Sequence, residues 1–407
     1  MGNKTEKSNV KNAIIIGFTC VFIYAGYYYL KNVLSVFTPQ MIENSEMFTK
    51  ESIAGFTSVY MILYAVGQLI NGTLGDVIHP RYMILSGLSL AGAAMFVFPL
   101  VNVYAVRMVC FAVLGFGVSM LRGPLVKVFS ENTLPHHARI ISVFFSFVFF
   151  VGPLIAGVFA VWMKWNTAFT VSAVIAWAMA AFGFVMMTVL EKRGIINHGA
   201  VKKEKKKIDI IGIFKIKSFI PFFLMGMIGE ISGTSIIFWV PTYITERLGF
   251  PSNISGVIST VMMFAKALSP FVCLFLYKAF KGRAAVMIGS MFFLSALIYA
   301  AMIFIGNSWI NLVLFSLAIA ITGVSSSTIW SIYIPSLAKS GKVSGANGVM
   351  DSGGYFVASG ASVLFGSIIE NLGWNAIIIT WCAVMVIGTV ITLFARRSKA
   401  EQAEQSE

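Results

Sequence analysis

Residues 283–305 read RAAVMIGSMFFLSALIYAAMIFI, one arginine followed by 22 residues without a charge. A helix needs about 20 largely apolar residues to cross the roughly 30 Å hydrocarbon core of a bilayer. This stretch therefore predicts a membrane-spanning helix. The whole chain has the same character, because 58% of its 407 residues are apolar and 11% are charged. Soluble globular proteins carry about 25% charged residues, so the composition excludes a water-soluble enzyme.

Eleven further apolar stretches predict an all-α membrane protein with twelve spans. The approximate spans are 12–39, 50–75, 80–100, 103–132, 136–161, 165–190, 218–246, 251–279, 283–305, 309–337, 342–370 and 373–396. The basic segment 191–217 separates six spans from six. We therefore expect four parts, which are an N-terminal six-helix bundle over 1–190, this linker, a C-terminal six-helix bundle over 218–396 and a tail over 397–407.

Most of the positively charged residues lie on one side of the predicted membrane. The chain has 30 Lys and Arg against 16 Asp and Glu, a net charge of +14. Of the basic residues, 23 fall in the termini and the loops on one side of the predicted membrane, four on the other side and three within spans. Because cytoplasmic loops are rich in Lys and Arg, both termini are expected in the cytoplasm and the chain in the inner membrane. A nucleic-acid partner is not expected.

The two halves share a weak internal repeat. Gly157 precedes Trp165 by eight residues near the turn between spans five and six, and Gly366 precedes Trp374 by eight residues near the turn between spans eleven and twelve. Secondary transporters are built from repeated bundles that move about a central site, so the repeat favours a transporter. The chain contains no phosphate-binding loop of the G-x-x-x-x-G-K-[ST] form, which argues against a primary pump.

The turn between spans two and three reads Gly72-Thr-Leu-Gly75-Asp76-Val-Ile-His79-Pro80-Arg81. Glycine allows two helices to approach, and an aspartate and an arginine at the two helix ends can form a charged latch. We expect Gly72, Asp76 and Arg81 to form this latch and to bias one conformation. The pattern resembles the signature of the major facilitator superfamily, although Val77 stands where a basic residue is common. The resemblance implies two pseudo-symmetric six-helix bundles.

A closer resemblance begins in span one. Residues 27–32 read YYYLKN and lead to Pro39, and residues 239–243 of span seven read WVPTY. Both stretches are similar to the organophosphate:phosphate antiporter family, which includes the glycerol-phosphate and hexose-phosphate transporters. The resemblance implies an anion site with two arginines. Here Lys31 replaces one arginine and Gly233 stands at the place of the other, so phosphate recognition would be less directional.

Ionisable side chains inside spans predict the site itself. They are Lys31, Arg122, Glu230, Lys266 and Asp351. Each costs roughly 2.5–3.5 kcal/mol at a helix centre, so a role in a polar cavity is expected. The superfamily layout places spans 1, 4, 7 and 10 around the central cavity, and three of the five residues lie on those spans. Their charges sum to +1, which favours a small organic anion as substrate.

The two cations of the first half are the predicted substrate contacts. Arg122 is followed by Gly123-Pro124, where the proline removes a backbone hydrogen bond and can bend the helix. The alternative is a structural arginine that satisfies the freed carbonyls. Lys31 shares a helix face with Tyr28, three residues earlier, and its alternative is a side chain that reaches to the membrane interface.

The charged residues of the second half have two open interpretations. Glu230 either binds near the substrate and exchanges a proton or forms an ion pair with Lys31. Lys266 and Asp351 are expected to pair with each other, with proton coupling as the alternative. All four histidines fall in loops, so a proton relay would use carboxylates.

Aromatic and hydroxyl side chains complete the predicted site. Tyr27 and Tyr28 are expected to face the cavity from span one, together with Ser327, Trp330 and Tyr333 from span ten. Hydroxyls bind polar solutes, but small residues in spans also allow close helix packing, and both interpretations stay open.

These observations predict a secondary active transporter that moves a small organic anion, a phosphorylated metabolite or a sugar acid, by alternating access. Phosphate antiport and proton symport remain alternatives. A proton-driven exporter of multidrug or other apolar compounds is the rival function, and a transport-derived sensor or a channel is a further one. No enzymatic activity, cofactor or metal is expected, since the four cysteines lack metal-ligand spacing. The expected partners are the substrate, the coupling ion and the lipid bilayer, with the chain a monomer.

Overall fold

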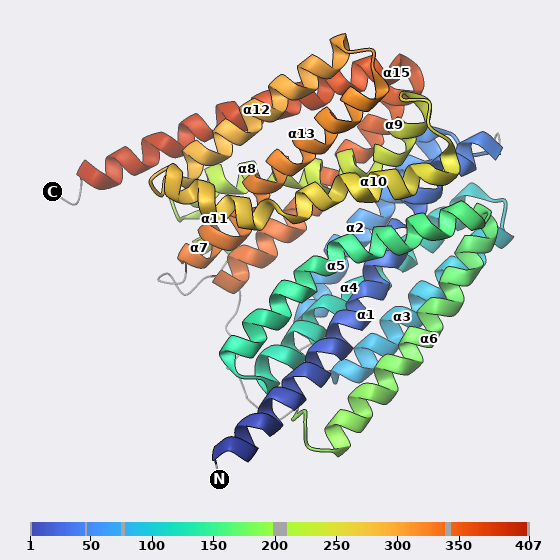
Figure 1. The fold of residues 1–407 in the computed structure, drawn as a ribbon, viewed down its shortest axis with the longest axis vertical. Coiled ribbons are helices and arrows are strands. Elements are labelled where there is room, and N and C mark those ends of the chain that lie inside the picture. Colours follow the sequence, from blue (N-terminus) through green and yellow to red (C-terminus); the bar gives the residue numbers. More distant parts are fainter. Residues whose placement is uncertain (1, 45–46, 75–77, 198–209, 338–342, 405–407) are drawn as a thin grey trace. The chain divides into compact units, whose positions relative to one another are not determined.

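The described part of the chain is almost entirely helical in a computed structural model (Figure 1). Lipid offers no hydrogen-bond partners, so a spanning segment must satisfy its backbone groups internally, and an apolar segment of this length does so as a helix. The described residues are 2–44, 47–74, 78–197, 210–337 and 343–404.

The chain divides into two compact units, which are described separately. Unit 1 comprises Met1–Met41 and Val59–Lys205. Unit 2 comprises Ile42–Ser58 and Lys206–Glu407. The segment Ile42–Ser58, which joins the first two long helices, thus belongs with the second half of the sequence.

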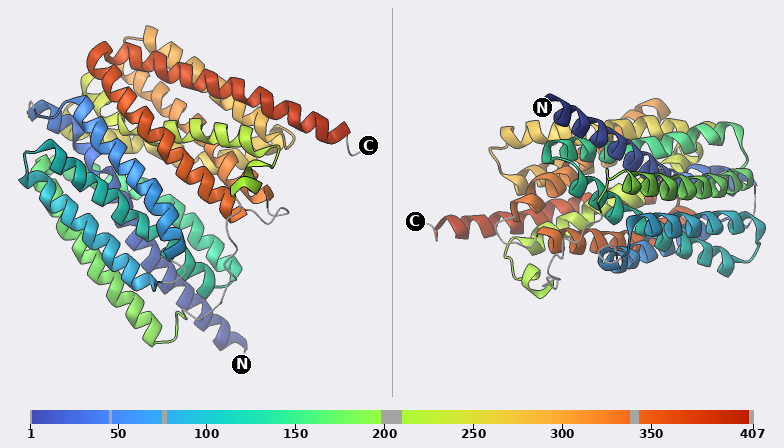
Figure 2. Two further views of the ribbon diagram at one scale, coloured as in Figure 1. Left: turned by 180° about the vertical axis from the view of Figure 1, so that it is seen from behind. Right: turned by 90° about the horizontal axis from the view of Figure 1, so that it is seen from below.

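Unit 1 is built from long helices that pack along their lengths. Its helices, two of which extend into Ile42–Ser58, are α1 (Gly2–Asn44), α2 (Lys50–Leu74), α3 (Pro80–Val97), α4 (Tyr104–Asn132), α5 (Pro135–Trp162) and α6 (Trp165–Lys192), with a 3₁₀ turn η1 (Phe98–Leu100). Helix α3 lies beside α4 and α6 (Figure 2). Gly87 of α3 faces Gly117 of α4, where a Cβ on Gly117 would lie 2.7 Å from the Gly87 carbonyl oxygen. Small residues at this crossing let two backbones touch.

Unit 2 contains interrupted helices as well as continuous ones. Its elements are α7 (Ile210–Phe214), α8 (Phe219–Glu230), η2 (Ile231–Ile236), α9 (Val240–Glu246), α10 (Ser252–Ala267), α11 (Ser269–Ala279), α12 (Ala284–Phe304), α13 (Ser308–Thr328), η3 (Ile329–Tyr333), α14 (Ile334–Ser336) and α15 (Val343–Glu404). Both η2 and η3 are π-helical segments. They interrupt the predicted spans seven and ten, and such segments often mark functional sites.

The helices agree with the predicted spans. Ten described helices are long and apolar enough to cross a membrane. Val148–Trp162 is a shorter apolar helix at the predicted fifth span, and Ala346–Ala395 is long enough for two spans. It turns at Gly373, whose φ of 78° and ψ of −176° are accessible essentially to glycine alone. The predicted all-α membrane fold with twelve spans is thereby confirmed.

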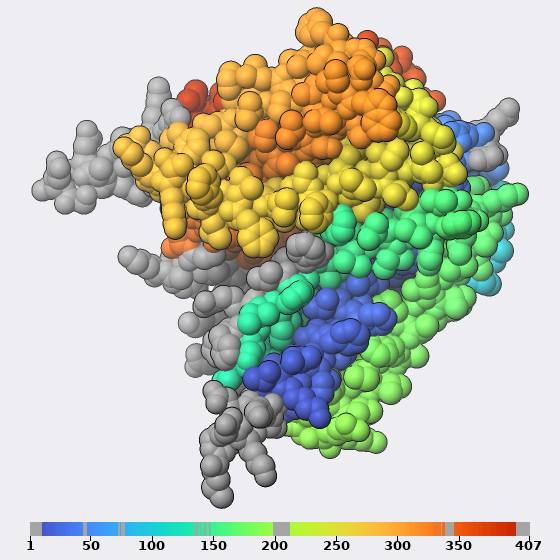
Figure 3. Space-filling view, viewed as in Figure 1, coloured from blue at the N-terminus to red at the C-terminus, as the bar shows by residue number. Residues whose placement is uncertain are grey.

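Helix α11 of unit 2 has an exposed apolar face. On α11, the side chains of Phe271, Leu274 and Phe275 are 58–73% exposed. This helix contributes to the yellow and light-orange surface in Figure 3. An exposed apolar surface of this kind would be unfavourable in water and is satisfied by lipid.

Candidate functional site

Tyr28 of α1 brings the two predicted substrate cations of unit 1 together. The Nζ of Lys31 lies 5.8 Å from the centre of the Tyr28 ring. Arg122, on α4, is close enough to the Tyr28 hydroxyl to act on it electrostatically. All three side chains are half-buried. Lys31 and Arg122, 91 positions apart in the sequence, thus each place a positive charge near Tyr28.

An aromatic cluster packs behind Tyr28. Tyr24 stacks on Phe145 at 3.7 Å and on Tyr27 at 5.0 Å between ring centres, and Tyr27 stacks on Tyr64 at 6.1 Å. Tyr24 also meets Tyr28 edge-to-face, at 5.2 Å between ring centres. Tyr27, predicted as a substrate contact, is 1% exposed and belongs to this cluster. Neighbouring rings cover Tyr27 in this structure, and it packs beside Tyr28.

The three consecutive tyrosines point in different directions, as helical spacing requires. Tyr29 turns towards α6, where its hydroxyl hydrogen-bonds with the Ser172 hydroxyl at 2.7 Å. Tyr27 and Tyr29 are buried, and Tyr28 alone of the three is half-buried. Tyr28 is therefore the tyrosine best placed to meet a ligand together with Lys31.

The charged residues of unit 2 lie near the first interruption. Glu230 is the last residue of α8, and its side chain packs against Gly354 of α15. Asp351 is buried one turn before Gly354 on the same helix. The Lys266 side chain extends from α10 towards α13 and η2, where its Nζ lies beside Gly233. Three ionisable groups of unit 2 therefore lie around the junction of α8 and η2, while the pairing of Lys266 with Asp351 stays a prediction.

The predicted residues of span ten separate into two environments. The Tyr333 ring stacks on Phe222 of α8 at 3.8 Å, and its hydroxyl lies 3.2 Å from the Ser218 hydroxyl. Tyr333 is 6% exposed and so packs η3 against α8. Ser327 and Trp330 are half-buried, which leaves part of each side chain accessible.

The predicted latch has a partner that the sequence reasoning missed. Arg81, at the start of α3, donates a hydrogen bond from Nη1 to Glu191 Oε2 at 2.9 Å. His79 Nδ1 lies 3.8 Å from the other oxygen of Glu191. Gly72 lies in α2, and Asp76 falls outside the described residues. Glu191 is the first residue of the predicted linker, and the structure places it near the end of α6. The signal in the sequence was that the end of span six and the turn between spans two and three lie on the same predicted side of the membrane.

A second polar network, within unit 2, was also missed. Lys50 Nζ lies 3.2 Å from Glu246 Oε2, which also accepts a hydrogen bond from Trp374 Nε1 at 2.9 Å. The Lys50 backbone N–H donates to Glu370 at 2.8 Å. The Glu370 carboxylate lies at the N-terminus of α2, where the helix dipole favours a negative charge. The network ties the segment Ile42–Ser58 to α9 and α15.

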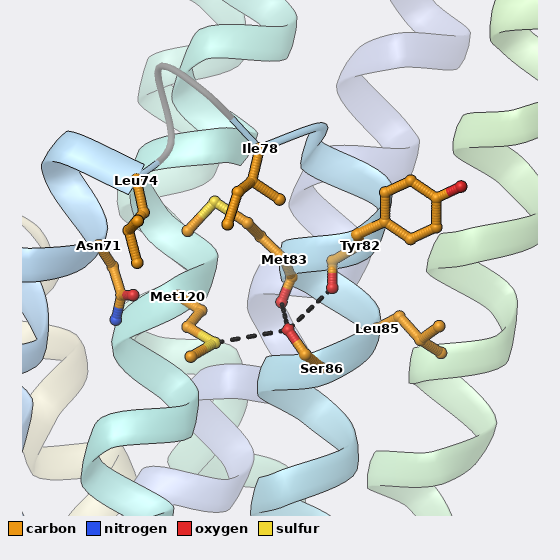
Figure 4. Close-up of a pocket in the computed structure, with 8 residues that line it drawn as sticks. All are labelled: Asn71, Leu74, Ile78, Tyr82, Met83, Leu85, Ser86 and Met120. Carbon is orange, nitrogen blue, oxygen red and sulfur yellow. Dashed lines mark hydrogen bonds between the residues drawn. The ribbon is translucent and has the colours of Figure 1, made fainter.

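A cavity of about 350 Å³ lies in unit 1 beside α2, α3 and α4 (Figure 4). Its wall is mostly apolar, with two exceptions. The Ser86 hydroxyl bonds the Tyr82 carbonyl at 2.8 Å, and the buried Asn71 Oδ1 has no hydrogen-bond partner among the described residues. The lining residues are Asn71, Leu74, Ile78, Tyr82, Met83, Leu85, Ser86 and Met120. None of them is a predicted substrate contact.

Among the described residues, no three His, Cys, Asp or Glu side chains gather closely enough to hold a metal ion. Cys20, Cys110 and Cys273 are buried free thiols, and Cys382 is a half-buried one.

Many apolar helices in two units, with charged side chains of both signs inside the spans, define a multi-pass membrane protein of the transporter class. The family model of the Major Facilitator Superfamily matches residues 18–358 and 231–407 of this chain. The chain therefore belongs to the major facilitator superfamily. No curated protein matches it.

Solved structures share the fold at low sequence identity. The nucleoside transporter NupG is 13% identical, with a TM-score of 0.69, over 95% of this chain and 98% of that one. A D-xylose-proton symporter is 12% identical, with a TM-score of 0.69, over 93% and 97%. A POT family transporter in complex with 5-aminolevulinic acid is 14% identical, with a TM-score of 0.75, over 95% and 96%. At these identities the likeness concerns the fold alone.

Proposed function

We propose that this protein is a secondary active transporter of a small organic anion, a phosphorylated metabolite or a sugar acid, that works by alternating access. The observation that carries the proposal is the convergence of Lys31 and Arg122 on Tyr28 in unit 1. Two positive charges near one half-buried tyrosine suit a carboxylate or phosphate group, which accepts charge-assisted hydrogen bonds from all three side chains.

Energetics support an anion as the guest. Each cation inside a span costs roughly 2.5–3.5 kcal/mol on insertion scales. Two neighbouring cations also repel each other, and a negative ligand offsets both costs. Unit 2 supplies Glu230 and Asp351, carboxylates that suit proton coupling. Fold alone names no solute, since the similar structures include a nucleoside transporter and a xylose symporter.

The finer assignment extends the resemblance to the organophosphate:phosphate antiporters. Phosphate antiport and proton symport are the two coupling modes, and Lys31 in place of an arginine favours a substrate that needs no bidentate clamp. We place the chain in the inner membrane as a monomer with both termini in the cytoplasm, on the distribution of Lys and Arg. The turn from Gly72 to Arg81 is proposed to bias one conformation.

Uptake into proteoliposomes tests this function. Purified protein is assayed with radiolabelled glucuronate and glycerol 3-phosphate, in the wild type and in Lys31→Ala and Arg122→Ala. Loss of a charged hydrogen bond predicts at least about a ten-fold lower rate in both variants. Lys164→Ala, which removes an exposed cation, is the matched control and keeps the wild-type rate. Anion uptake that is unchanged in both site variants contradicts the proposal.

The rival function, a proton-driven exporter of multidrug or other apolar compounds, draws on the aromatic cluster around Tyr24 and Tyr27. These rings are buried against one another, whereas an exporter of this kind needs accessible apolar walls. A resistance assay in cells that overproduce the protein separates the two functions: resistance to apolar cations without anion uptake favours the exporter.

A further inference from the structure

The ammonium of Lys266, on α10, lies beside Gly233 of η2 in unit 2. A Cβ built on Gly233 would have one described neighbour within 4 Å, the Nζ of Lys266, at 3.3 Å. The ammonium therefore lies at the position that a side chain of residue 233 would enter. A side chain larger than hydrogen there would compete with the charge for the same space.

A second glycine accommodates the stem of the same lysine. The Cγ of Lys266 lies 2.9 Å from the Cβ position of Gly323 on α13, which is too close for a real Cβ. The lysine thus leaves α10, crosses α13 over Gly323 and ends with its charge at Gly233. Glycine thus stands at two positions along the path of one cation, and Gly323 also accommodates the Ser269 side chain.

The end of this path is polar and irregular. The ammonium lies at η2, the π-helical segment that interrupts span seven one residue after Glu230. Ser232 of this segment donates a hydrogen bond to Thr322 Oγ1 on α13 at 2.9 Å. Glu230 lies one turn before Gly233, and Asp351 lies on α15 one turn before the glycine that Glu230 contacts. Unit 2 therefore presents a cation among hydroxyls and carboxylates, where polar groups can serve a ligand.

We propose that Lys266 is an anion-binding residue of unit 2 and that Gly233 leaves room for its ammonium at an anion site within that unit. The proposal rests on the function proposed above and deepens it. The ligand group is a carboxylate or a phosphate, because a lysine offers a compact charge that both accept. Glu230 and Asp351 supply negative charge in the same region when no substrate is bound.

Relocating the cation tests this geometry. The variants are Lys266→Ala, Lys266→Gln, the double variant Gly233→Lys with Lys266→Ala, and its uncharged match Gly233→Ala with Lys266→Ala. Lys278→Ala, an exposed lysine of the same span, is the control. Each is assayed in proteoliposomes with glucuronate and with glycerol 3-phosphate, which distinguishes carboxylate from phosphate substrates. KM and kcat are measured separately.

Removal of the Lys266 charge is expected to lower kcat/KM at least about ten-fold, mainly through KM. The relocated lysine is expected to recover most of this loss, whereas the uncharged double variant does not. Lys278→Ala stays at the wild-type value.

Two results overturn the inference. One is wild-type kcat/KM in Lys266→Gln. The other is equal loss in the charged and uncharged double variants, both purified as monodisperse protein. If Lys266→Ala does not fold, Lys266→Gln decides the question, because it keeps a long polar side chain without the charge. Uptake that depends on Lys31 and Arg122 but not on Lys266 refutes this inference alone. Absence of anion uptake by the wild type refutes the function itself.

Discussion

The crossing of α3 and α4 at Gly87 and Gly117 gives a quantitative prediction for Gly117→Ala. The new Cβ would lie 2.7 Å from the Gly87 carbonyl oxygen and 3.1 Å from the Leu90 Cβ. A carbonyl oxygen in the middle of a helix cannot rotate away, so the two helices must separate. Gly117→Ala is therefore expected to destabilise unit 1 even though alanine is the better helix former.

The magnitude follows from two opposing terms. Overpacking of a close contact costs about 1–3 kcal/mol, and replacing glycine by alanine inside a helix gains roughly 0.5–1 kcal/mol. The net loss is thus about 0–2.5 kcal/mol. The matched control is Gly360→Ala on α15, where a Cβ has open space, so only the gain applies. The difference between the two variants isolates the overpacking cost of about 1–3 kcal/mol.

The assay is unfolding by SDS in mixed micelles, followed by tryptophan fluorescence, for the wild type and both variants under identical conditions. We expect Gly117→Ala to unfold at a lower SDS fraction than the wild type and Gly360→Ala at an equal or higher one. Equal stability of the two variants would refute the direct backbone contact between α3 and α4.

Three further predictions concern stability and use the same assay. A double-mutant cycle on Arg81 and Glu191 is expected to give a coupling energy of about 0.5–1 kcal/mol, since the pair is partly exposed. A coupling energy of zero would show that the pair does not stabilise unit 1. Asn307 caps α13 by accepting two backbone N–H groups, so Asn307→Ala costs about 1 kcal/mol while Asn307→Asp retains the cap, and equal effects would exclude capping. Gly373→Ala costs about 1–3 kcal/mol because of its positive φ, whereas Leu372→Ala, 71% exposed, changes little; a neutral Gly373→Ala would disprove the turn.

The candidate site could be predicted only in part. The sequence placed Lys31 and Tyr28 on one helix face because their spacing is three residues, a local property that the helix guarantees. It did not reveal that Arg122 approaches the same tyrosine, since that depends on how α1 and α4 pack. Tyr27 and Tyr333 were predicted as contacts from their residue type. In this structure Tyr27 packs against Tyr24, one turn earlier, and against Tyr64 of α2, and Tyr333 packs against Phe222 of α8.

The sequence by itself determined the spans, because lipid leaves an apolar segment of about 20 residues no stable alternative to a helix. It also determined which charges lie inside those spans. Only the tertiary structure decided which charges meet which partners. Arg81 meets Glu191 across 110 positions, and the Lys266 ammonium lies beside Gly233 across 33. Such contacts depend on where helices pack against each other, and no local periodicity encodes where two helices cross.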